Sequence, residues 1–173
     1  TTVDLDGTIG AGTAIGGDVR INTNLSGAVM IDGDVTSDGN VTINSATSIA
    51  IGAVTVRADA DTAGGGTLSI TADDDTDDSG DLTAASGSTL RGHTVTLAGE
   101  NVTTDAVTAD TGDATITADN EVTMNAATVA TVANVVVTAA DDDVNINAAV
   151  TAGTNVDIEA TAGDILQSTG DIQ

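Results

Sequence analysis

The sequence predicts an all-β parallel β-solenoid, in which the chain coils into stacked turns and equivalent residues lie above one another. Three observations predict this fold. A repeat of about 21 residues runs through the chain, and periods of this length are typical of solenoids. Within each repeat, apolar and polar residues alternate at period two, as in short half-buried strands. No apolar i, i+3, i+4 pattern persists, so we expect no helix.

The repeat is clearest near the C-terminus, where residues 112–132, 133–153 and 154–173 align. Two apolar-x-apolar pairs recur in each repeat. The pairs stack as Ala114/Ile116 over Val135/Val137 over Val156/Ile158, and as Val122/Met124 over Val144/Ile146 over Ile165/Gln167.

Tracing these pairs upstream gives three apolar columns, and each column predicts one strand per turn. The first column contains Val3, Val19, Val41, Leu68, Val95, Ala114, Val135 and Val156. The second contains Val29, Ile49, Leu82, Val102, Val122, Val144 and Ile165. The third and weaker column contains Ile15, Val35, Val54, Leu90, Val107, Val129, Val150 and Ile172. About three short strands per turn and about eight turns follow, of which the first is poorly defined.

Turn-forming residues separate the columns. Gly-Asp recurs directly before an apolar residue, for example at 17–18, 80–81 and 163–164, as expected for corners of a coil. The two longest intervals in the first column predict insertion loops near 57–66 and 73–80, which a solenoid accommodates at its corners. We expect residues 1–173 to form a single solenoid segment that belongs to a longer repeat array.

Stacked amides are also predicted. Asn134 aligns with Asn155, and Asn125 aligns with Asn147. Because neighbouring turns lie about 4.8 Å apart, such amides can bond to one another along the stack. These pairs are candidate asparagine ladders.

The composition limits the functions that the chain can have. It has no Phe, Trp, Tyr, Pro, Cys or Lys, so a core must be aliphatic and no disulfide can form. The net charge of −24 opposes binding to nucleic acid or to an anionic membrane, both of which need basic patches. No apolar run approaches the length of a membrane span.

Residues 133–153 and 154–173, together with GDLTAA at 80–85 and GDILQS at 163–168, carry a family resemblance. They resemble the haemagglutinin-type repeats of large secreted bacterial adhesins, above all the filamentous haemagglutinin family exported by two-partner secretion. The resemblance covers residues 18–173 and is one of composition and period. It implies a right-handed parallel β-helix at the bacterial cell surface or outside the cell. It carries over no functional residue.

One acidic run is the candidate metal site, formed by Asp73, Asp74, Asp75, Asp77 and Asp78. Ca²⁺ binds closely spaced carboxylate and carbonyl oxygens. The run lacks the glutamate and central glycine of an EF-hand loop, and residues 64–68 do not match the glycine-rich nonapeptide calcium motif. A solvated acidic loop is therefore favoured, with a Ca²⁺ site as the alternative. No other cofactor is predicted.

No catalytic residue is predicted. His93 is the only histidine, and a catalytic base needs a nucleophile or an orienting partner within reach. We expect His93 to lie at the surface or at a corner. We expect Arg20, Arg57 and Arg91 to pair with neighbouring carboxylates.

Two other functional classes fit the sequence less well than a structural role does. Polysaccharide-acting enzymes share this fold, but their sugar grooves usually use aromatic platforms, which this chain lacks. Ice-binding solenoids need a regular outward threonine array, and the series Thr96, Thr115, Val136, Asp157 is irregular.

The sequence therefore predicts a non-catalytic structural or adhesive shaft of an extracellular or cell-surface filament. Its acidic surface is expected to prevent lateral clumping. The predicted partners are flanking repeats or identical subunits placed end to end, and a cell-surface receptor or glycan. The alternative is a calcium-stabilised matrix or surface-layer filament built by end-to-end assembly.

Overall fold

The chain forms a parallel β-solenoid of about 7 turns, with about 21 residues and three strands in each turn. A computed structural model describes residues 2–10, 13–23, 27–62, 65–73 and 79–173. Strands β1 to β21 account for all the regular structure of these residues, and none of them is helical. The predicted fold class is confirmed.

The strands form three parallel sheets, which we number 1 to 3. Sheet 1 contains β2 (Val19–Thr23), β5 (Val41–Ser45), β8 (Thr67–Thr71), β11 (Thr94–Gly99), β14 (Ala114–Ala118), β17 (Val135–Ala139) and β20 (Val156–Ala160). Sheet 2 contains β1 (Val3–Leu5), β3 (Val29–Ile31), β6 (Ile49–Ile51), β9 (Leu82–Ala84), β12 (Val102–Thr104), β15 (Val122–Met124), β18 (Val144–Ile146) and β21 (Ile165–Gln167). Sheet 3 contains β4 (Val35–Thr36), β7 (Thr55–Arg57), β10 (Thr89–Gly92), β13 (Ala106–Ala109), β16 (Thr128–Ala130) and β19 (Val150–Ala152).

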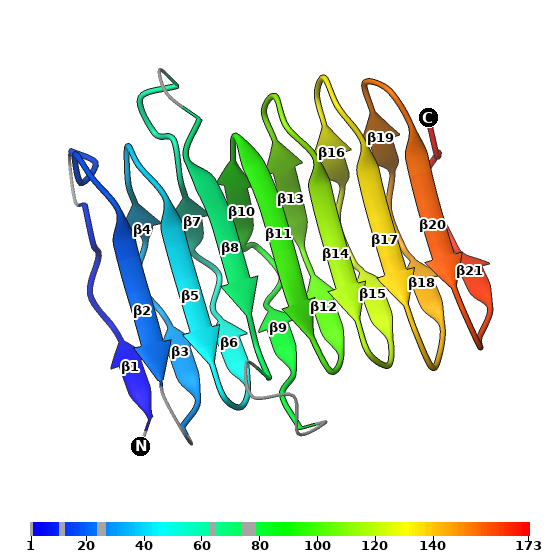
Figure 1. Ribbon diagram of the computed structural model, residues 1–173, viewed down its shortest axis with the longest axis horizontal. Coiled ribbons are helices and arrows are strands. Elements are labelled where there is room, and N and C mark those ends of the chain that lie inside the picture. The colour runs from blue at the N-terminus through cyan, green and yellow to red at the C-terminus, as the bar shows by residue number, and fades with distance from the viewer. Residues whose placement is uncertain (1, 11–12, 24–26, 63–64, 74–78) are drawn as a thin grey trace.

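The path of the chain repeats in every turn, from sheet 1 to sheet 2 to sheet 3 and back (Figure 1). In Figure 1 the strands of sheet 1 run downward in front, sheets 2 and 3 return upward behind them, and successive turns advance to the right. This sense of rotation makes the solenoid right-handed, as is nearly universal for crossovers between parallel strands.

The stacking register matches the predicted apolar columns over most of the chain. Ala114 pairs with Val135, which pairs with Val156. In sheet 2, Val122 pairs with Val144, which pairs with Ile165. The apolar pairs that align in the sequence are therefore neighbours along the stack.

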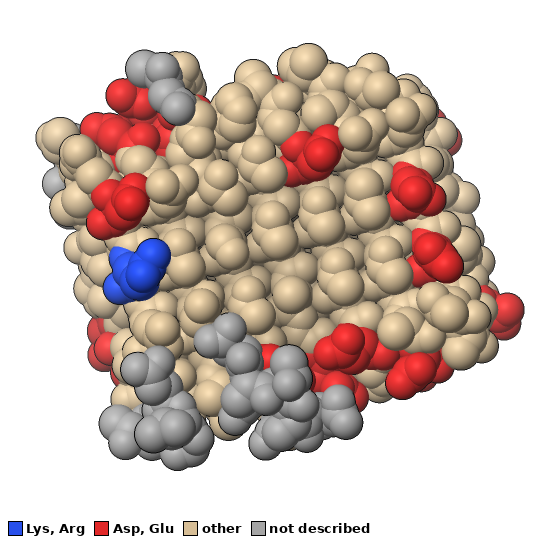
Figure 2. All heavy atoms as spheres, viewed as in Figure 1, with Lys and Arg blue, Asp and Glu red and all other residues tan. Residues whose placement is uncertain are grey.

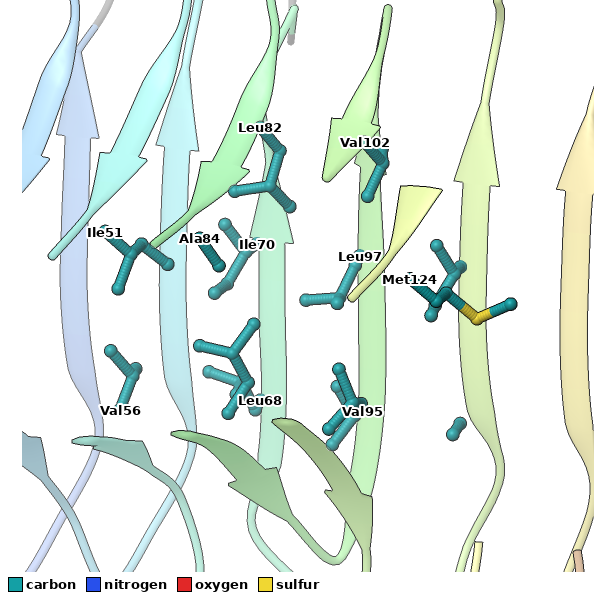
Figure 3. Packing of buried hydrophobic residues seen from close by; sticks show 14 of the residues in the cluster. Ile51, Val56, Leu68, Ile70, Leu82, Ala84, Val95, Leu97, Val102 and Met124 are labelled. Atoms are coloured by element: carbon teal, nitrogen blue, oxygen red, sulfur yellow. The ribbon is translucent and has the colours of Figure 1, made fainter. Parts of the chain in front are cut away.

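The core is a single aliphatic column enclosed by the three sheets. Leu68, Leu82 and Leu90 come from sheets 1, 2 and 3 respectively, and each is 0% exposed. Figure 3 shows side chains from all three sheets pointing into the same interior, with Met124 as a sulfur-bearing member. Each turn buries its apolar side chains mainly against the turns directly above and below, so stability is distributed along the stack.

The first predicted column contains one error. Val3 lies in sheet 2, where it pairs with Val29, and not in sheet 1 below Val19. The chain then contributes isolated bridges at Ile9 and Ile15 to sheet 3 before it enters β2. Sheet 1 therefore begins at β2, and the structure has about 7 turns where the columns predicted about eight.

The third predicted column contains two errors of register. Val56, not Val54, stacks between Val35 and Leu90. Thr128, not Val129, pairs with Val107 and is fully buried, and its hydroxyl lies 3.6 Å from the Met124 sulfur. A shift of one residue moves a side chain to the opposite face of a strand, so Val129 points outward.

Ile15 also differs from the third-column prediction, because its bridge partner is Ser37. The longest intervals do leave the stack intact. Val41 pairs with Leu68, which pairs with Val95, so the additional residues lie in the connections β7–β8 and β8–β9.

Candidate functional site

The predicted acidic run is only partly described. Asp74, Asp75, Asp77 and Asp78 lie outside the described residues. Asp73 is described and is buried, with 5% of its surface exposed. Its backbone has a φ of 58°, and its N–H donates to the carbonyl of Thr47 at 3.2 Å. Asp73 thus marks a tight corner directly after β8.

Two further carboxylates join Asp73 at this corner. One oxygen each of Asp73, Glu100 and Asp119 lies within 4.8 Å of the others. The three residues follow β8, β11 and β14, which are neighbouring strands of sheet 1. The solenoid therefore gathers acids from three successive turns into one group, which we call the corner carboxylates.

The corner carboxylates have the donor chemistry that a hard cation prefers. Ca²⁺ takes six to eight oxygen ligands, and three carboxylates can supply up to six when each binds through both oxygens. Like charges at this separation repel one another unless solvent or a cation screens them. Because Asp73 is buried while Asp119 is exposed, the group lies at the edge of the core with one open side.

A second acidic group lies at the start of the chain. Asp4, Asp6 and Asp32 also bring one oxygen each within 4.8 Å of one another. All three side chains are exposed, so water competes fully for any ion between them. The corner carboxylates are the better candidate of the two.

Polar ladders follow the corners of the stack. Asn155 Nδ2 donates to Asn134 Oδ1 at 3.2 Å, and Asn134 Nδ2 donates to Asp113 Oδ1 at 3.0 Å. Asn147 Nδ2 likewise donates to Asn125 Oδ1 at 3.1 Å. Both predicted asparagine pairs are confirmed. Their hydrogen bonds join consecutive turns directly before β17 and β20 and directly after β15 and β18.

A third ladder was not predicted. Asn120 Nδ2 donates to Asn101 Oδ1 at 2.9 Å, and Asn101 Nδ2 donates to Asp81 Oδ1 at 2.8 Å. The sequence did contain a signal for part of it, because Asp81 and Asn101 each stand directly before a second-column residue. These ladders satisfy side-chain polar groups and hold the turns in register.

The charged side chains near sheet 3 form an ion pair. Arg91 Nη2 lies 2.8 Å from Asp110 Oδ1, and Arg91 Nε donates to Asp110 Oδ2 at 2.9 Å. The hydrogen bond to Asp110 raises the pKa of Arg91 above its ordinary value, although burial acts in the opposite direction. Arg91 was correctly predicted to pair with a carboxylate, whereas Arg20 and Arg57 form no ion pair within the described residues.

His93 lies at the corner between β10 and β11, as predicted. Its ring contacts the hydroxyl of Thr111, with Nε2 3.1 Å from Thr111 Oγ1. Thr111 is also tied to His93 through the backbone, because its N–H donates to the His93 carbonyl at 3.3 Å. The imidazole therefore packs on the next turn of the solenoid.

The fold and these contacts define a parallel β-solenoid repeat protein with an aliphatic core and polar corner ladders. No family model matches the chain, and no curated protein or solved structure is significantly similar to it. The described residues include no helix with the length and apolarity needed to cross a membrane.

Proposed function

We propose that the chain is a structural and adhesive shaft segment of a secreted or cell-surface filamentous protein and that it has no catalytic role. A single observation carries this proposal. The inward positions are aliphatic in nearly every turn from Val19 to Val150, while the outward positions differ in residue type from turn to turn. A stiff, repeated scaffold requires aliphatic inward positions, whereas it places no such requirement on the outward positions.

The charge distribution supports the same role. The chain has twenty-seven acidic residues and three arginines, and this net charge favours the solubility of a long rod. Repulsion between like charges also opposes association of rods over most of their surface. The polar corner ladders add bonds between turns, in parallel with the backbone ladders. In a shaft, these bonds resist separation of one turn from the next.

Single-molecule stretching between the two ends tests the shaft role. Each turn of about 21 residues would release roughly 70 Å of chain when it detaches. We expect a series of force peaks whose spacing is that length or a multiple of it, because turns contact only their neighbours. A smooth extension without peaks would show that the stack bears no load and would contradict the proposal.

The corner carboxylates favour a second candidate, a calcium-stabilised matrix or surface-layer filament. If they bind Ca²⁺ only in the folded state, the melting temperature rises with the Ca²⁺ concentration. The free energy of unfolding then increases by about 2.7 kcal/mol when Ca²⁺ is at a hundredfold excess over Kd. Asp119→Asn should abolish this rise, whereas Asp157→Asn, an exposed carboxylate on β20, should keep it.

The calcium measurement is thermal unfolding with millimolar Ca²⁺ and, separately, with Na⁺ at the same ionic strength. Screening of the net charge of −24 raises the melting temperature equally in both salts. Equal melting temperatures would therefore exclude a specific calcium site at this corner.

A further inference from the structure

The outward face of sheet 1 is uncharged along its inner strands, although the chain as a whole is strongly acidic. Side chains at alternate positions of its strands point away from the core and stack into two straight rows (Figure 2). The first row is uncharged on the inner strands, where it consists of Thr42, Ser69, Thr96, Thr115 and Val136.

The second row lies two residues further along each strand and is also uncharged on the inner strands. It consists of Asn44, Thr71, Ala98, Thr117 and Thr138. We call the two rows together the threonine face. In a chain with a net charge of −24, a flat area of this extent without a carboxylate is a local minimum of electrostatic repulsion.

Charges of opposite sign stand at the two ends of the first row. Arg20 precedes Thr42 in the first row, and Asp157 follows Val136. Glu159 ends the second row. All three side chains are exposed, and Figure 2 shows the basic group over β2 and acidic groups over β20 with an uncharged surface between them.

This arrangement is complementary to itself. β11 is the central strand of sheet 1, with β2 and β20 at equal distances on either side. A twofold axis parallel to the strands and opposite β11 would place β2 of one copy against β20 of another. Arg20 of each copy would then face Asp157 of the other, and the two uncharged areas would meet between these pairs.

We propose that the threonine face binds the same face of a second copy of this chain, with the two stacks antiparallel. This proposal does not depend on the shaft role. If no dimer is found, the proposed shaft role is unaffected. The proposed pairing would confine the expected repulsion between shafts to the surface outside the threonine face.

The size of the face sets the strength of the interaction. Seven strands at about 4.8 Å and five residues at about 3.3 Å give a footprint of roughly 600 Å² per copy. This area is at the lower end for specific interfaces, and the face has no aromatic anchor. The pair is therefore weak and reversible in isolated segments. A longer shaft that continued the face would bind more tightly through many such contacts.

The hydroxyl groups fit such an interface. Threonine and serine both donate and accept hydrogen bonds, so two facing rows can bond directly or through retained water. Their methyl groups supply apolar contact between the rows. Neither row requires a charge to be buried except at the two ends. There Arg20 meets Asp157, and Glu159 meets Asn22, whose amide can donate a hydrogen bond to it.

Sedimentation equilibrium from about 10 µM to about 1 mM, the range that brackets weak interfaces, tests for the pair. We expect a reversible monomer–dimer equilibrium. Thr96→Glu places two carboxylates against each other at the twofold axis and should raise Kd at least about tenfold. Its matched control is Thr103→Glu on β12 of sheet 2, which adds the same charge in the same turn on another face and should change Kd less than about twofold.

Crosslinking tests the orientation, because the chain has no cysteine of its own. The double variant Asn22→Cys/Glu159→Cys joins the two ends of the second row and keeps the Arg20–Asp157 pairs. Treated with a short thiol crosslinker, it should give closed dimers. End-to-end stacking would also bring these positions together, but it would give a ladder of higher oligomers. Asn22→Cys/Leu166→Cys, with an exposed position on sheet 2, is the control and should give little product.

The results that overturn the proposal are distinct. A monomer at every concentration excludes a pair of any kind. Equal effects of Thr96→Glu and Thr103→Glu exclude the threonine face as the interface. A ladder of crosslinked oligomers assigns the contact to the ends of the stack. If Thr96→Glu fails to fold, as judged by circular dichroism, the crosslinking pattern still decides between these outcomes.

Discussion

Leu97→Ala is expected to lower the free energy of unfolding by about 2–5 kcal/mol. Leu97 lies on β11 at the centre of sheet 1 and is 0% exposed. It stacks between Ile70 and Ile116 of the neighbouring turns, so its loss leaves a cavity with aliphatic walls above and below. The loss is a large fraction of the 5–15 kcal/mol that typically separates folded from unfolded protein.

Urea unfolding followed by far-ultraviolet circular dichroism measures this loss, because the chain has no Trp or Tyr to report by fluorescence. Thr96→Ala is the matched control, since Thr96 is the adjacent residue and points outward. We expect this control to change stability by no more than about 0.5 kcal/mol. Similar losses in both variants would contradict the assignment of inward and outward positions.

The inward columns of sheets 1 and 2 were predictable from sequence because their alternation has few competing registers. Strands of sheet 1 such as β5 and β17 span five residues, so a shift of one residue would expose several apolar side chains at once. The alternation within each strand therefore determines which residues point inward. Because equivalent strands stack in register, every turn gives the same prediction.

Sheet 3 was less predictable because its inward positions are not always aliphatic. In β16, which spans three residues, the only branched aliphatic side chain is Val129, and it points outward while Thr128 is buried. The Thr128 hydroxyl reaches the Met124 sulfur, so the core accepts a polar atom that hydropathy alone would place outside. A pattern of hydrophobic residues cannot detect a buried polar atom whose partner lies on a different strand.

The candidate site was only partly predictable for a different reason. The sequence drew attention to acids adjacent along the chain, whereas the solenoid brings together acids that are one turn apart. Glu100 and Asp119 join Asp73 because each follows a strand of sheet 1. Stacking from turn to turn also places Arg20 and Asp157 at opposite ends of one row, although they are far apart in the sequence.

The turns differ in length, yet their strands stack in a uniform register, because the additional residues lie at the corners. The connections β7–β8 and β8–β9 are longer than those of other turns, yet Val41, Leu68 and Val95 remain in register. The chain must therefore return to a fixed position after each insertion. At one of these corners a glycine, Gly66, lies so close to the preceding turn that an added Cβ would overlap the carbonyl oxygen of Gly39.

Gly66→Val is expected to destabilise the fold by about 3 kcal/mol or more, the upper end of the range for overpacking. Gly66 is buried directly before β8. A Cβ there would overlap the carbonyl oxygen of Gly39 in the preceding turn and would lie 2.7 Å from the backbone nitrogen of Asp59. Both contacts are to backbone, so neither can be relieved by a change of rotamer, and two turns must move apart.

Gly16→Val provides the comparison, because a Cβ at Gly16 meets nothing within 4 Å. Urea unfolding of the two variants should give a large drop in midpoint for Gly66→Val and almost none for Gly16→Val. Equal midpoints would mean that the turns can separate at this corner without cost. In that case the register of the stack would be held by its strands alone, and the glycine would be dispensable.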